Sequence, residues 1–575
     1  MKPTLAWRDL WAYWQYEVGK KRDAGVGIGL EMREGAALIE TAIAEGSPTR
    51  ADRDALDDML AAAREGEGDA SGGRRLAMLL SPGAHEVMRR VAPRVNLSQL
   101  DAPLPLWVDR ERALFSAWYE LFPRSWGRDG AHGTFRDVEK RLDYVSDLGF
   151  DVLYFPPIHP IGRTNRKGKN NTLTPTEDDV GVPYAIGSPE GGHDAVHPEL
   201  GTLEDFESLV AAARGHGLEV AIDFAIQCSP DHPWIKAHPE WFDWRPDGSI
   251  RYAENPPKKY EDIVNVHFYR DAKPAMWHEW LRIVRFWIAR GVTIFRVDNP
   301  HTKPFPFWEW LIGEVHRDHP EAIFLAEAFT RPKVMKRLAK VGYNQSYSYF
   351  TWRNEKWEIE QYMRELTGQL PGWEDMPWVM RPNFFVNTPD INPVYLQTGG
   401  RAAHRVRLIL AATLGTNYGV YNGFEICEAR PIAGKEEYLD SEKYQLRAWD
   451  MDRKGHIKDD IRFVNRLRHE HAALRQFDGL RFYNATNERI LYYAKMLPDR
   501  SDFVLVAVNL DPHNAQGADI EVPMWEFGLS DNAAVDAIDL VTGAPFRWQG
   551  KWQSVWLTPD DRPYAMWHIK GAARG

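Results

Sequence analysis

Cysteine is nearly absent from this sequence of 575 residues, which contains only Cys228 and Cys427. Two cysteines are too few for a disulfide framework and are typical of a reducing compartment, so we expect a cytoplasmic protein. No apolar run approaches the roughly 20 residues of a membrane span, and the charged N-terminus lacks the apolar stretch of a secretory signal. The formal net charge of −11 argues against a nucleic-acid partner. These absences predict a protein without membrane or nucleic-acid partners.

From about residue 105, segments with helical spacing of apolar residues alternate with short apolar runs. Gly149, Gly217 and Gly291 each fall between such a helix and the run that follows, where helix C-caps place glycine. About eight such βα units fit before residue 475, which favours a closed (β/α)8 barrel of the α/β class. We therefore expect an N-terminal helical region over 1–104, a catalytic barrel over 105–477 with inserted substrate loops at 157–201 and 225–273, and a C-terminal β-sandwich over 478–575.

Three short strings follow one another in the predicted barrel: FRVDNPH around Asp298, FLAEAF around Glu327, and FFVNTPD, which ends at Asp390. Each begins with apolar or aromatic residues, as a buried strand does, and each carries a carboxylate just past that run. Catalytic residues of such barrels lie at the C-terminal ends of the strands, because all of these ends open onto one face. Carboxylates on that face predict an enzyme that cleaves glycosidic bonds.

The order of these carboxylates suggests a role for each in a retaining mechanism. Asp298 is the predicted nucleophile, since Arg296 stands two residues earlier on the same strand face and favours its charged form. Glu327 ends the next strand and is the predicted acid and base, because its longer side chain can reach the leaving-group oxygen. Asp390 is expected to orient sugar hydroxyls and stabilise the transition state, and Asp223 is expected to be a structural carboxylate.

The three strings also resemble the sequence regions of the α-amylase superfamily, over roughly residues 110–475. A longer set of strings resembles, more narrowly, the α-1,4-glucan:maltose-1-phosphate maltosyltransferase family. That resemblance implies a retaining transferase without a cofactor, which passes maltosyl units from α-maltose 1-phosphate to the non-reducing end of an α-glucan through a covalent maltosyl-enzyme intermediate. The strings are PPIHPIGRTNRKGKNN, EGGHDAVHPELGTLEDF, DFAIQCSPDHPW, YAENPPKKYEDI, FRVDNPHTKPFPFWEWL, FLAEAFTRPKVMKRLAK and EEYLDSEKY.

The sequence departs from ordinary amylases where hydrolases place histidines against sugar. Gln227 and Cys228 occupy positions at which amylases usually carry Asn and His, and the usual His before the last carboxylate is replaced by Pro389. These departures agree with the narrower resemblance. They imply that sugar binding differs from that of an ordinary amylase.

The resemblance implies a phosphate site at Asn299, directly after the nucleophile, and at Lys258 and Tyr260 of the string PPKKY. A phosphate leaving group needs a cation and hydrogen-bond donors, and Lys259 could supply the cation instead of Lys258. The residues that the resemblance places against the maltosyl group are Lys167, Gln227, Asp262 and Lys443.

No cluster with the spacing of metal ligands stands out, so no metal site is predicted. Histidines in loops and apolar segments are more often packing residues than ligands. We expect this of His159, His193, His197 and His301.

Two other functions stay open at this point. A glucan hydrolase or another transglycosidase on the same fold would act without a phosphorylated donor, and the set Asn299, Lys258 and Tyr260 is what distinguishes it. A non-catalytic glucan-binding protein would have no use for the three carboxylates, which are present. The resemblance also implies a homodimer, formed through a β-rich N-terminal domain with a helical insert. Here we expect the leading strands of that domain to be missing, because helical patterns begin almost at the first residue.

Overall fold

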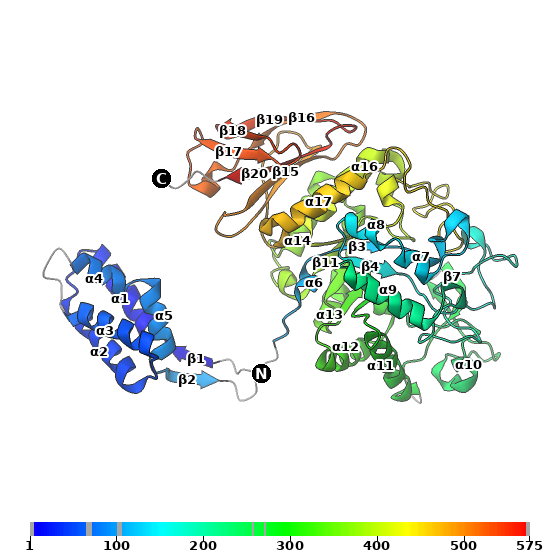
Figure 1. Ribbon diagram of the computed structural model, residues 1–575, viewed down its shortest axis with the longest axis horizontal. Coiled ribbons are helices and arrows are strands. Elements are labelled where there is room, and N and C mark those ends of the chain that lie inside the picture. Colours follow the sequence, from blue (N-terminus) through cyan, green and yellow to red (C-terminus); the bar gives the residue numbers. More distant parts are fainter. Residues whose placement is uncertain (1–4, 65–71, 100–105, 256–257, 270–271, 571–575) are drawn as a thin grey trace. The chain divides into compact units, whose positions relative to one another are not determined.

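The computed structural model describes residues 5–64, 72–99, 106–255, 258–269 and 272–570. The chain divides into two compact units, residues 1–108 and 109–575. The first unit is blue in Figure 1, and the second runs from cyan to red.

The first unit is a helical bundle whose core includes Trp11, Trp14 and Ile39. Helices were expected almost from the start of the chain, but a strand comes first and pairs with a strand after the last helix, with Ala6 opposite Ser98. A strand of four residues whose partner lies at the other end of the unit leaves no recognisable pattern in the sequence. The elements are β1 (Leu5–Arg8), α1 (Leu10–Asp23), α2 (Gly29–Glu45), α3 (Arg50–Arg64), α4 (Gly72–Leu79), α5 (Pro82–Val91) and β2 (Val95–Gln99).

The second unit is built around a closed barrel of eight strands, so the predicted fold class is confirmed. Each strand is parallel to the next barrel strand along the chain, and β12 closes on β3 through pairs such as Tyr418 with Ala117. The barrel strands are β3 (Ser116–Glu120), β4 (Val152–Phe155), β5 (Glu219–Phe224), β8 (Ile294–Val297), β9 (Ile323–Ala326), β10 (Gln345–Tyr347), β11 (Pro382–Phe385) and β12 (Asn417–Tyr421).

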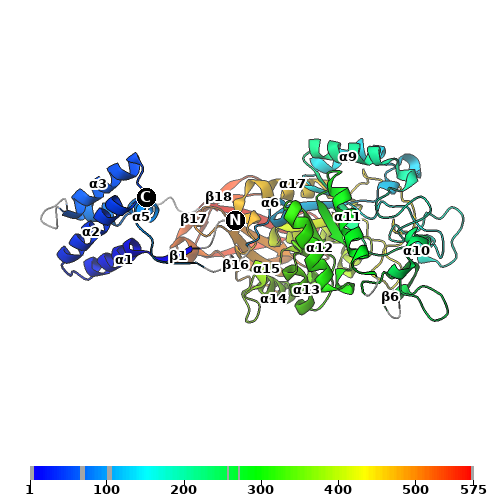
Figure 2. The same cartoon turned by 90° about the horizontal axis from the view of Figure 1, so that it is seen from below.

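Helices surround the barrel, as Figure 1 and Figure 2 show for α9, α11 and α12. Gly149, Gly217 and Gly291 precede three of the strands and have φ angles of 82°, 75° and 89°, the left-handed conformation expected of helix-ending glycines. The helices are α6 (Glu111–Leu114), α7 (Phe135–Glu139), α8 (Leu142–Asp147), α9 (Leu203–Gly215), α10 (Trp234–Ala237), α11 (Ala275–Ile288), α12 (Phe305–Asp318), α13 (Pro332–Lys340), α14 (Lys356–Leu366), α15 (Met376–Val379), α16 (Val394–Leu414) and α17 (Lys458–Glu470).

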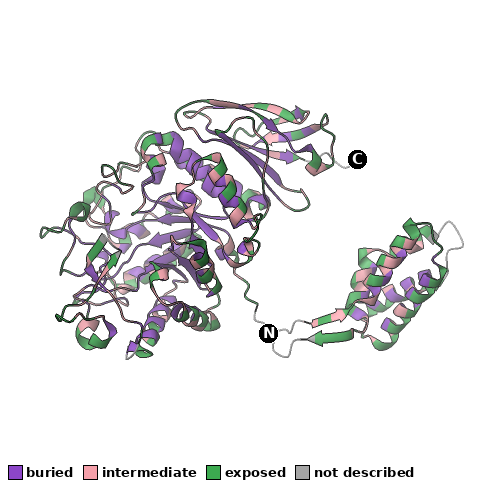
Figure 3. Cartoon of the chain, turned by 180° about the vertical axis from the view of Figure 1, so that it is seen from behind, coloured by how far each residue is buried: buried purple, intermediate pink, exposed green. Residues whose placement is uncertain are grey.

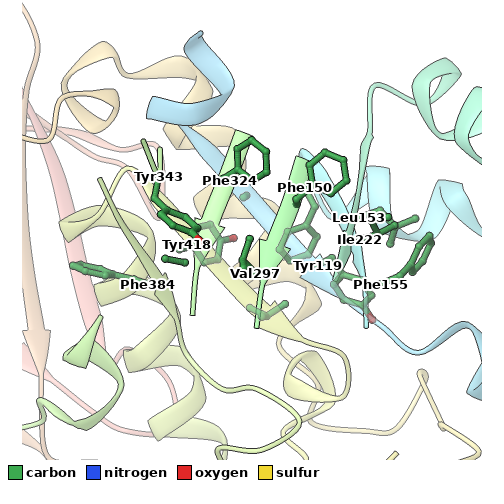
Figure 4. Packing of buried hydrophobic residues seen from close by; sticks show 14 of the residues in the cluster. Tyr119, Phe150, Leu153, Phe155, Ile222, Val297, Phe324, Tyr343, Phe384 and Tyr418 are labelled. Carbon is green, nitrogen blue, oxygen red and sulfur yellow. The ribbon is translucent and has the colours of Figure 1, made fainter. Parts of the chain in front are cut away.

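Side chains of the barrel strands alternate between the outer core and the barrel interior, because successive residues of a strand point to opposite faces. Leu153, Phe155 and Val297 pack in the outer core, where Figure 4 shows them with Phe324 and Phe384. The barrel strands are almost fully buried, whereas the helices expose one side (Figure 3). The interior is filled by a second set, which includes Trp118, Val152, Tyr154, Ala221, Ile294, Ile323 and Leu325.

Two long segments leave the barrel at the C-terminal ends of strands. Residues 156–202 join β4 to α9, and residues 225–274 join β5 to α11. The second contains short helices and the antiparallel hairpin of β6 (Tyr252–Asn255) and β7 (Lys258–Val264). Both segments emerge on the face where catalytic residues of such barrels lie, so they can form the walls of a substrate cleft.

The chain ends in an antiparallel domain, which we predicted as a β-sandwich. A six-stranded sheet in the order β13-β14-β15-β20-β17-β18 shares a core with a smaller sheet of β16 and β19, to which Leu505, Ile520 and Trp567 contribute. None of the helices that the structure describes combines the length and apolar character that a membrane span requires. The strands are β13 (Leu480–Phe482), β14 (Ile490–Met496), β15 (Phe503–Asn509), β16 (Gln516–Glu521), β17 (Ala534–Asp539), β18 (Pro545–Gln549), β19 (Trp552–Leu557) and β20 (Tyr564–Lys570).

Candidate active site

Strand β8 brings an arginine and a carboxylate to the mouth of the barrel. Ile294 points into the interior, so Arg296 and Asp298, two and four residues later, point the same way. Both side chains are buried. The chain then turns at Asn299, whose φ of 41° lies in the left-handed region that asparagine tolerates better than most residues. The turn continues into the short 3₁₀ helix Pro300–Thr302 and then into α12.

The guanidinium of Arg296 holds three carboxylates at the ends of neighbouring strands. Its Nη1 lies 2.8 Å from Oδ2 of Asp223 and 3.0 Å from Oδ1 of Asp298. Its Nη2 lies 2.9 Å from Oε1 of Glu327. One buried cation therefore sets the positions of the predicted nucleophile and the predicted acid and base relative to each other.

Asp223 lies beneath the site and is fully enclosed by protein. Its Oδ2 accepts hydrogen bonds from the hydroxyls of Tyr154, at 2.7 Å, and Tyr184, at 2.9 Å. Burial raises the pKa of Asp223 to about 7, against the opposing effect of Arg296. These contacts agree with the structural role expected of this carboxylate.

The environment separates the pKa values of the two candidate catalytic carboxyls. Burial raises the pKa of Glu327 to about 8, and the charges of Asp298 and Asp390 add to this against the effect of Arg296. Burial also acts to raise the pKa of Asp298, but Arg296, Lys303 and a hydrogen bond from Glu327 outweigh it and hold that pKa below its usual range. Near neutral pH, Glu327 is protonated and Asp298 is ionised, the division that a general acid and a nucleophile require.

Asn299 contacts both of these carboxyls. Its backbone N–H donates to Oε2 of Glu327 at 3.3 Å, and its side-chain amide donates to Oδ2 of Asp298 at 3.4 Å. The resemblance implied a phosphate contact for Asn299. The structure places it at the cleft, next to both catalytic candidates.

Asp390 lies on the loop that follows β11 and forms an ion pair with Lys443. Nζ of Lys443 is 2.6 Å from Oδ1 of Asp390 and 5.3 Å from the centre of the Tyr184 ring. Burial acts to lower the pKa of Lys443, but Asp390 outweighs it and raises that pKa above its ordinary value. Lys443, one of the two lysines expected to contact the maltosyl group, is therefore charged and stands beside the carboxylate expected to orient sugar hydroxyls.

A cleft with a volume of about 1330 Å³ opens over these groups. It is larger than the roughly 300–1,000 Å³ of most small-molecule sites, which suits an oligosaccharide substrate. Arg296 lies beneath the cleft and is not among the residues that line it. The prediction for Lys258 falls on a side chain that is not among those the structure describes. The predicted residues that line the cleft are Asp298, Glu327, Asp390, Lys167, Gln227, Tyr260, Asp262, Asn299 and Lys443, together with the alternative Lys259.

Of the residues expected to bind the maltosyl group, Lys167, Gln227 and Asp262 come from the two inserted segments, and Lys443 lies between β12 and α17. Lys167 is buried and bonds to Glu261, and the side-chain amide of Gln227 donates to the carbonyl of Tyr184 at 3.4 Å. Burial raises the pKa of Asp262. These are polar groups held in place at a cleft wall, as the binding of sugar hydroxyls requires.

Three side chains near the site were not predicted from the sequence. Glu120 points inward because it stands two residues after Trp118 on β3, a signal that strand alternation offered. Burial raises the pKa of Glu120 well above its ordinary value, against the opposing effect of Arg296. Tyr184 comes from an inserted segment whose path no local pattern predicts. Lys303 lines the cleft five residues after Asp298, on the same loop.

Among the described residues, one group of possible metal ligands is fully buried: His193, Cys228 and His232 bring their ligand atoms within 4.8 Å of one another. Nε2 of His193 donates to the carbonyl of Ala225 at 3.0 Å, and Nδ1 of His232 accepts from the backbone N–H of Trp234 at 3.1 Å. The second bond leaves the proton of a neutral His232 on Nε2. Burial raises the pKa of the Cys228 thiol, which keeps it protonated. These bonds favour a packing role for the group.

The other histidines named above lie in loops near the barrel mouth. Nδ1 of His159 donates to the carbonyl of Ala195 at 2.9 Å, and Nδ1 of His197 accepts from the backbone of Glu199 at 3.2 Å. His301 lines the cleft. Two further groups of possible metal ligands occur in the described part of the chain, His132 with His197 and Glu199, and His471 with Asp502 and His568.

Solved structures of similar fold include amylases. The noncanonic maltogenic α-amylase AmyB from Thermotoga neapolitana is 18% identical, with a TM-score of 0.62 over 80% of this chain and 99% of that one. An α-amylase from Geobacillus thermoleovorans, solved with acarbose, is 15% identical, with a TM-score of 0.61 over 81% of this chain and 100% of that one. At such identities the likeness shows the fold alone.

Family models and curated relatives are more specific. The models match residues 4–110 ("Alpha-1,4-glucan:maltose-1-phosphate maltosyltransferase, domain N/S"), 120–323 ("Alpha amylase, catalytic domain") and 482–569 ("GLGE, C-terminal"). An α-1,4-glucan:maltose-1-phosphate maltosyltransferase of Cereibacter sphaeroides is 62% identical over 98% of this chain and 83% of its own length. A protein of the same name from Pseudomonas aeruginosa is 53% identical over 98% of this chain and 84% of its own length. With such identity over nearly its whole length, the chain belongs to the α-1,4-glucan:maltose-1-phosphate maltosyltransferase family.

Proposed function

We propose that this chain transfers maltosyl units from α-maltose 1-phosphate to the non-reducing end of α-1,4-glucans and releases phosphate, with retention at the anomeric carbon. Family membership supports maltosyl transfer. The observation that carries the finer proposal is the arrangement around Arg296, which holds Asp298 and Glu327 together while their pKa values diverge. A nucleophile and an acid in such an arrangement support double displacement.

In the first step, Asp298 attacks C1 of the donor and the bond from C1 to the phosphate oxygen breaks. The oxygen leaves with the bonding electron pair and receives the proton of Glu327, while a β-maltosyl ester of Asp298 remains. Arg296 keeps the nucleophile ionised before the attack. Asp390 stabilises the positive charge that develops on the sugar ring.

In the second step, the 4-hydroxyl of the terminal glucose of the acceptor attacks C1 from the face that phosphate has left. Glu327, now a carboxylate, takes the hydroxyl proton, and the bond between C1 and Asp298 breaks. Esterification removes the charge of Asp298 and so lowers the pKa of Glu327 between the steps, as its change from acid to base requires. Two inversions restore the α configuration.

The substrate contacts are part of the same proposal. We assign the phosphate to Asn299 and Tyr260 with Lys258 or Lys259. Tyr260 is 36% exposed at the cleft, where its hydroxyl can donate to an entering anion. The maltosyl group is assigned to Lys167, Gln227, Asp262 and Lys443.

The test is inorganic phosphate release from α-maltose 1-phosphate, measured with and without maltohexaose, while products are sized by mass spectrometry. We expect rapid release only with the acceptor, and one phosphate for each product lengthened by two glucose units. Shortening of maltohexaose without any phosphate release would contradict the proposal and favour a glucan hydrolase.

A further inference from the structure

The loop that follows the candidate nucleophile carries a lysine into the cleft. After the left-handed turn at Asn299, the chain passes through Thr302 to Lys303, directly before Pro304 and α12. The hydroxyl of Thr302 donates to the carbonyl of Asn299 at 2.7 Å, and Nζ of Lys303 donates to the same hydroxyl at 2.7 Å. These two bonds brace the ammonium against the turn that also positions Asp298.

Three other lysines that line the cleft already have carboxylate partners. Lys167 bonds to Glu261, Lys443 pairs with Asp390 at 2.6 Å, and Lys435 pairs with Glu437 at 3.9 Å. These pairs neutralise their own charge. These three pairs therefore add little net positive charge to the cleft.

Lys303 differs from these lysines. No carboxylate oxygen of the described residues lies within 4.0 Å of its Nζ, and its hydrogen bond to Thr302 is to a neutral group. The nearby ring of His301 has a buried Nδ1 without a hydrogen-bond partner in the described part of the chain, and it also lines the cleft. The ammonium of Lys303 and the ring of His301 are therefore available to bind an anion close to Asp298.

The electrostatic state of Lys303 supports a ligand at this point. Burial lowers the pKa of Lys303, and the charge of Asp298 opposes this without reversing it. An ammonium held partly out of water without a close counter-ion is costly. A phosphate group would offset that cost by supplying both charge and hydrogen-bond acceptors.

We propose that Lys303 binds the phosphate of the donor and stabilises the negative charge that phosphate gains as its bond to C1 breaks. This proposal rests on the proposed function. It adds a third lysine, on the loop that follows Asp298, to Lys258 and Lys259 of the β6–β7 hairpin, one of which was assigned to the phosphate above. The proton still comes from Glu327. The ammonium supplies charge and a hydrogen bond to a non-bridging phosphate oxygen, and no proton of its own is transferred.

The experiment compares two donors that share the maltosyl group and differ in the leaving group, α-maltose 1-phosphate and α-maltosyl fluoride. The variants are Lys303→Gln, which removes the charge, and Lys303→Arg, which keeps it. Lys340→Gln is the matched control, since Lys340 lies on α13 outside the cleft, in an ion pair with Asp375.

We expect Lys303→Gln to lower kcat/KM for α-maltose 1-phosphate by about 10- to 100-fold, the worth of one charged hydrogen bond. The fluoride donor should lose less than about threefold, because both donors need the same nucleophile. Lys303→Arg should restore much of the preference for the phosphate donor. Inorganic phosphate should inhibit turnover of the fluoride in the parent and do so about 10-fold less well in Lys303→Gln.

Equal losses with both donors would overturn the inference, because Lys303 would then act on Asp298 or on the sugar. No loss with either donor would overturn it too. If Lys303→Gln does not fold, Thr302→Val tests the same point by removing the hydroxyl that braces Lys303, and the loss should again be selective for the phosphate donor. A parent enzyme that turns over the fluoride but never releases phosphate would instead refute the proposed function.

Discussion

The backbone N–H of Asn299 donates to Glu327 across 3.3 Å, so the residue directly after the candidate nucleophile also holds the candidate acid and base. The left-handed φ of 41° at Asn299 aims its amide at the neighbouring strand end. Arg296 joins the same two carboxyls from inside the barrel. Two strands thus present one pair of candidate catalytic carboxyls, held by a backbone amide and a guanidinium.

Replacing Asp298 with alanine should abolish maltosyl transfer, because the ester intermediate cannot form. We expect phosphate release to fall by about 10⁴-fold or more, as for other nucleophile deletions. Binding of α-maltose 1-phosphate should persist, and calorimetry can measure it. Lys340→Gln serves as the control. Transfer at more than a few per cent of the parent rate would show that another residue is the nucleophile.

Replacing Glu327 with alanine should trap the maltosyl-enzyme. Fluoride leaves without a proton, so α-maltosyl fluoride should still esterify Asp298, whereas the acceptor hydroxyl then lacks its base. Mass spectrometry of the intact variant should show the added mass of one maltosyl group, and the adduct should be missing in Asp298→Ala. If no adduct accumulates at any time or pH, double displacement through this residue is wrong.

The rate of the first step should depend on the ionisation of Glu327. Its pKa is raised to about 8, so the protonated acid predominates below that pH and is lost above it. Single-turnover phosphate release should therefore fall as pH rises through about 8, by about tenfold per pH unit beyond it. Neither the reaction of the fluoride donor nor the phosphate release by Glu327→Gln should show this fall in rate above about pH 8. If the rate still falls above about pH 8 in Glu327→Gln, the group that titrates is not Glu327.

Replacing Arg296 with methionine should destabilise the second unit. The change leaves Asp223, Asp298 and Glu327 buried without their shared cation, and breaking a buried ion pair costs about 3–5 kcal/mol. Urea unfolding followed by tryptophan fluorescence measures the loss. Arg317→Ala is the control, since Arg317 is exposed and pairs with Glu314 on the helix surface. A loss no larger than that of the control would contradict a buried ion pair between Arg296 and an ionised Asp298.

Local patterns in the sequence were enough to place the catalytic candidates at strand ends. Apolar runs in the sequence indicated β8 and β9. Because residues two apart on a strand point to the same face, Arg296 and Asp298 point into the barrel as Ile294 does. The same rule would have found Glu120 two residues after Trp118. Local patterns did not reveal β1, because this strand is short and pairs with a strand that is distant in the sequence.

The sequence by itself determined the alternation of helices and strands, the barrel, and the order in which Asp298, Glu327 and Asp390 follow its strands, because each of these depends on residues that are near neighbours in the chain. Only the tertiary structure decided that Lys443 pairs with Asp390, that Lys167 pairs with Glu261, and that no carboxylate of the described residues pairs with Lys303. Those contacts join segments that are far apart in the chain. The charge on each side chain also depends on how much water the folded cleft excludes.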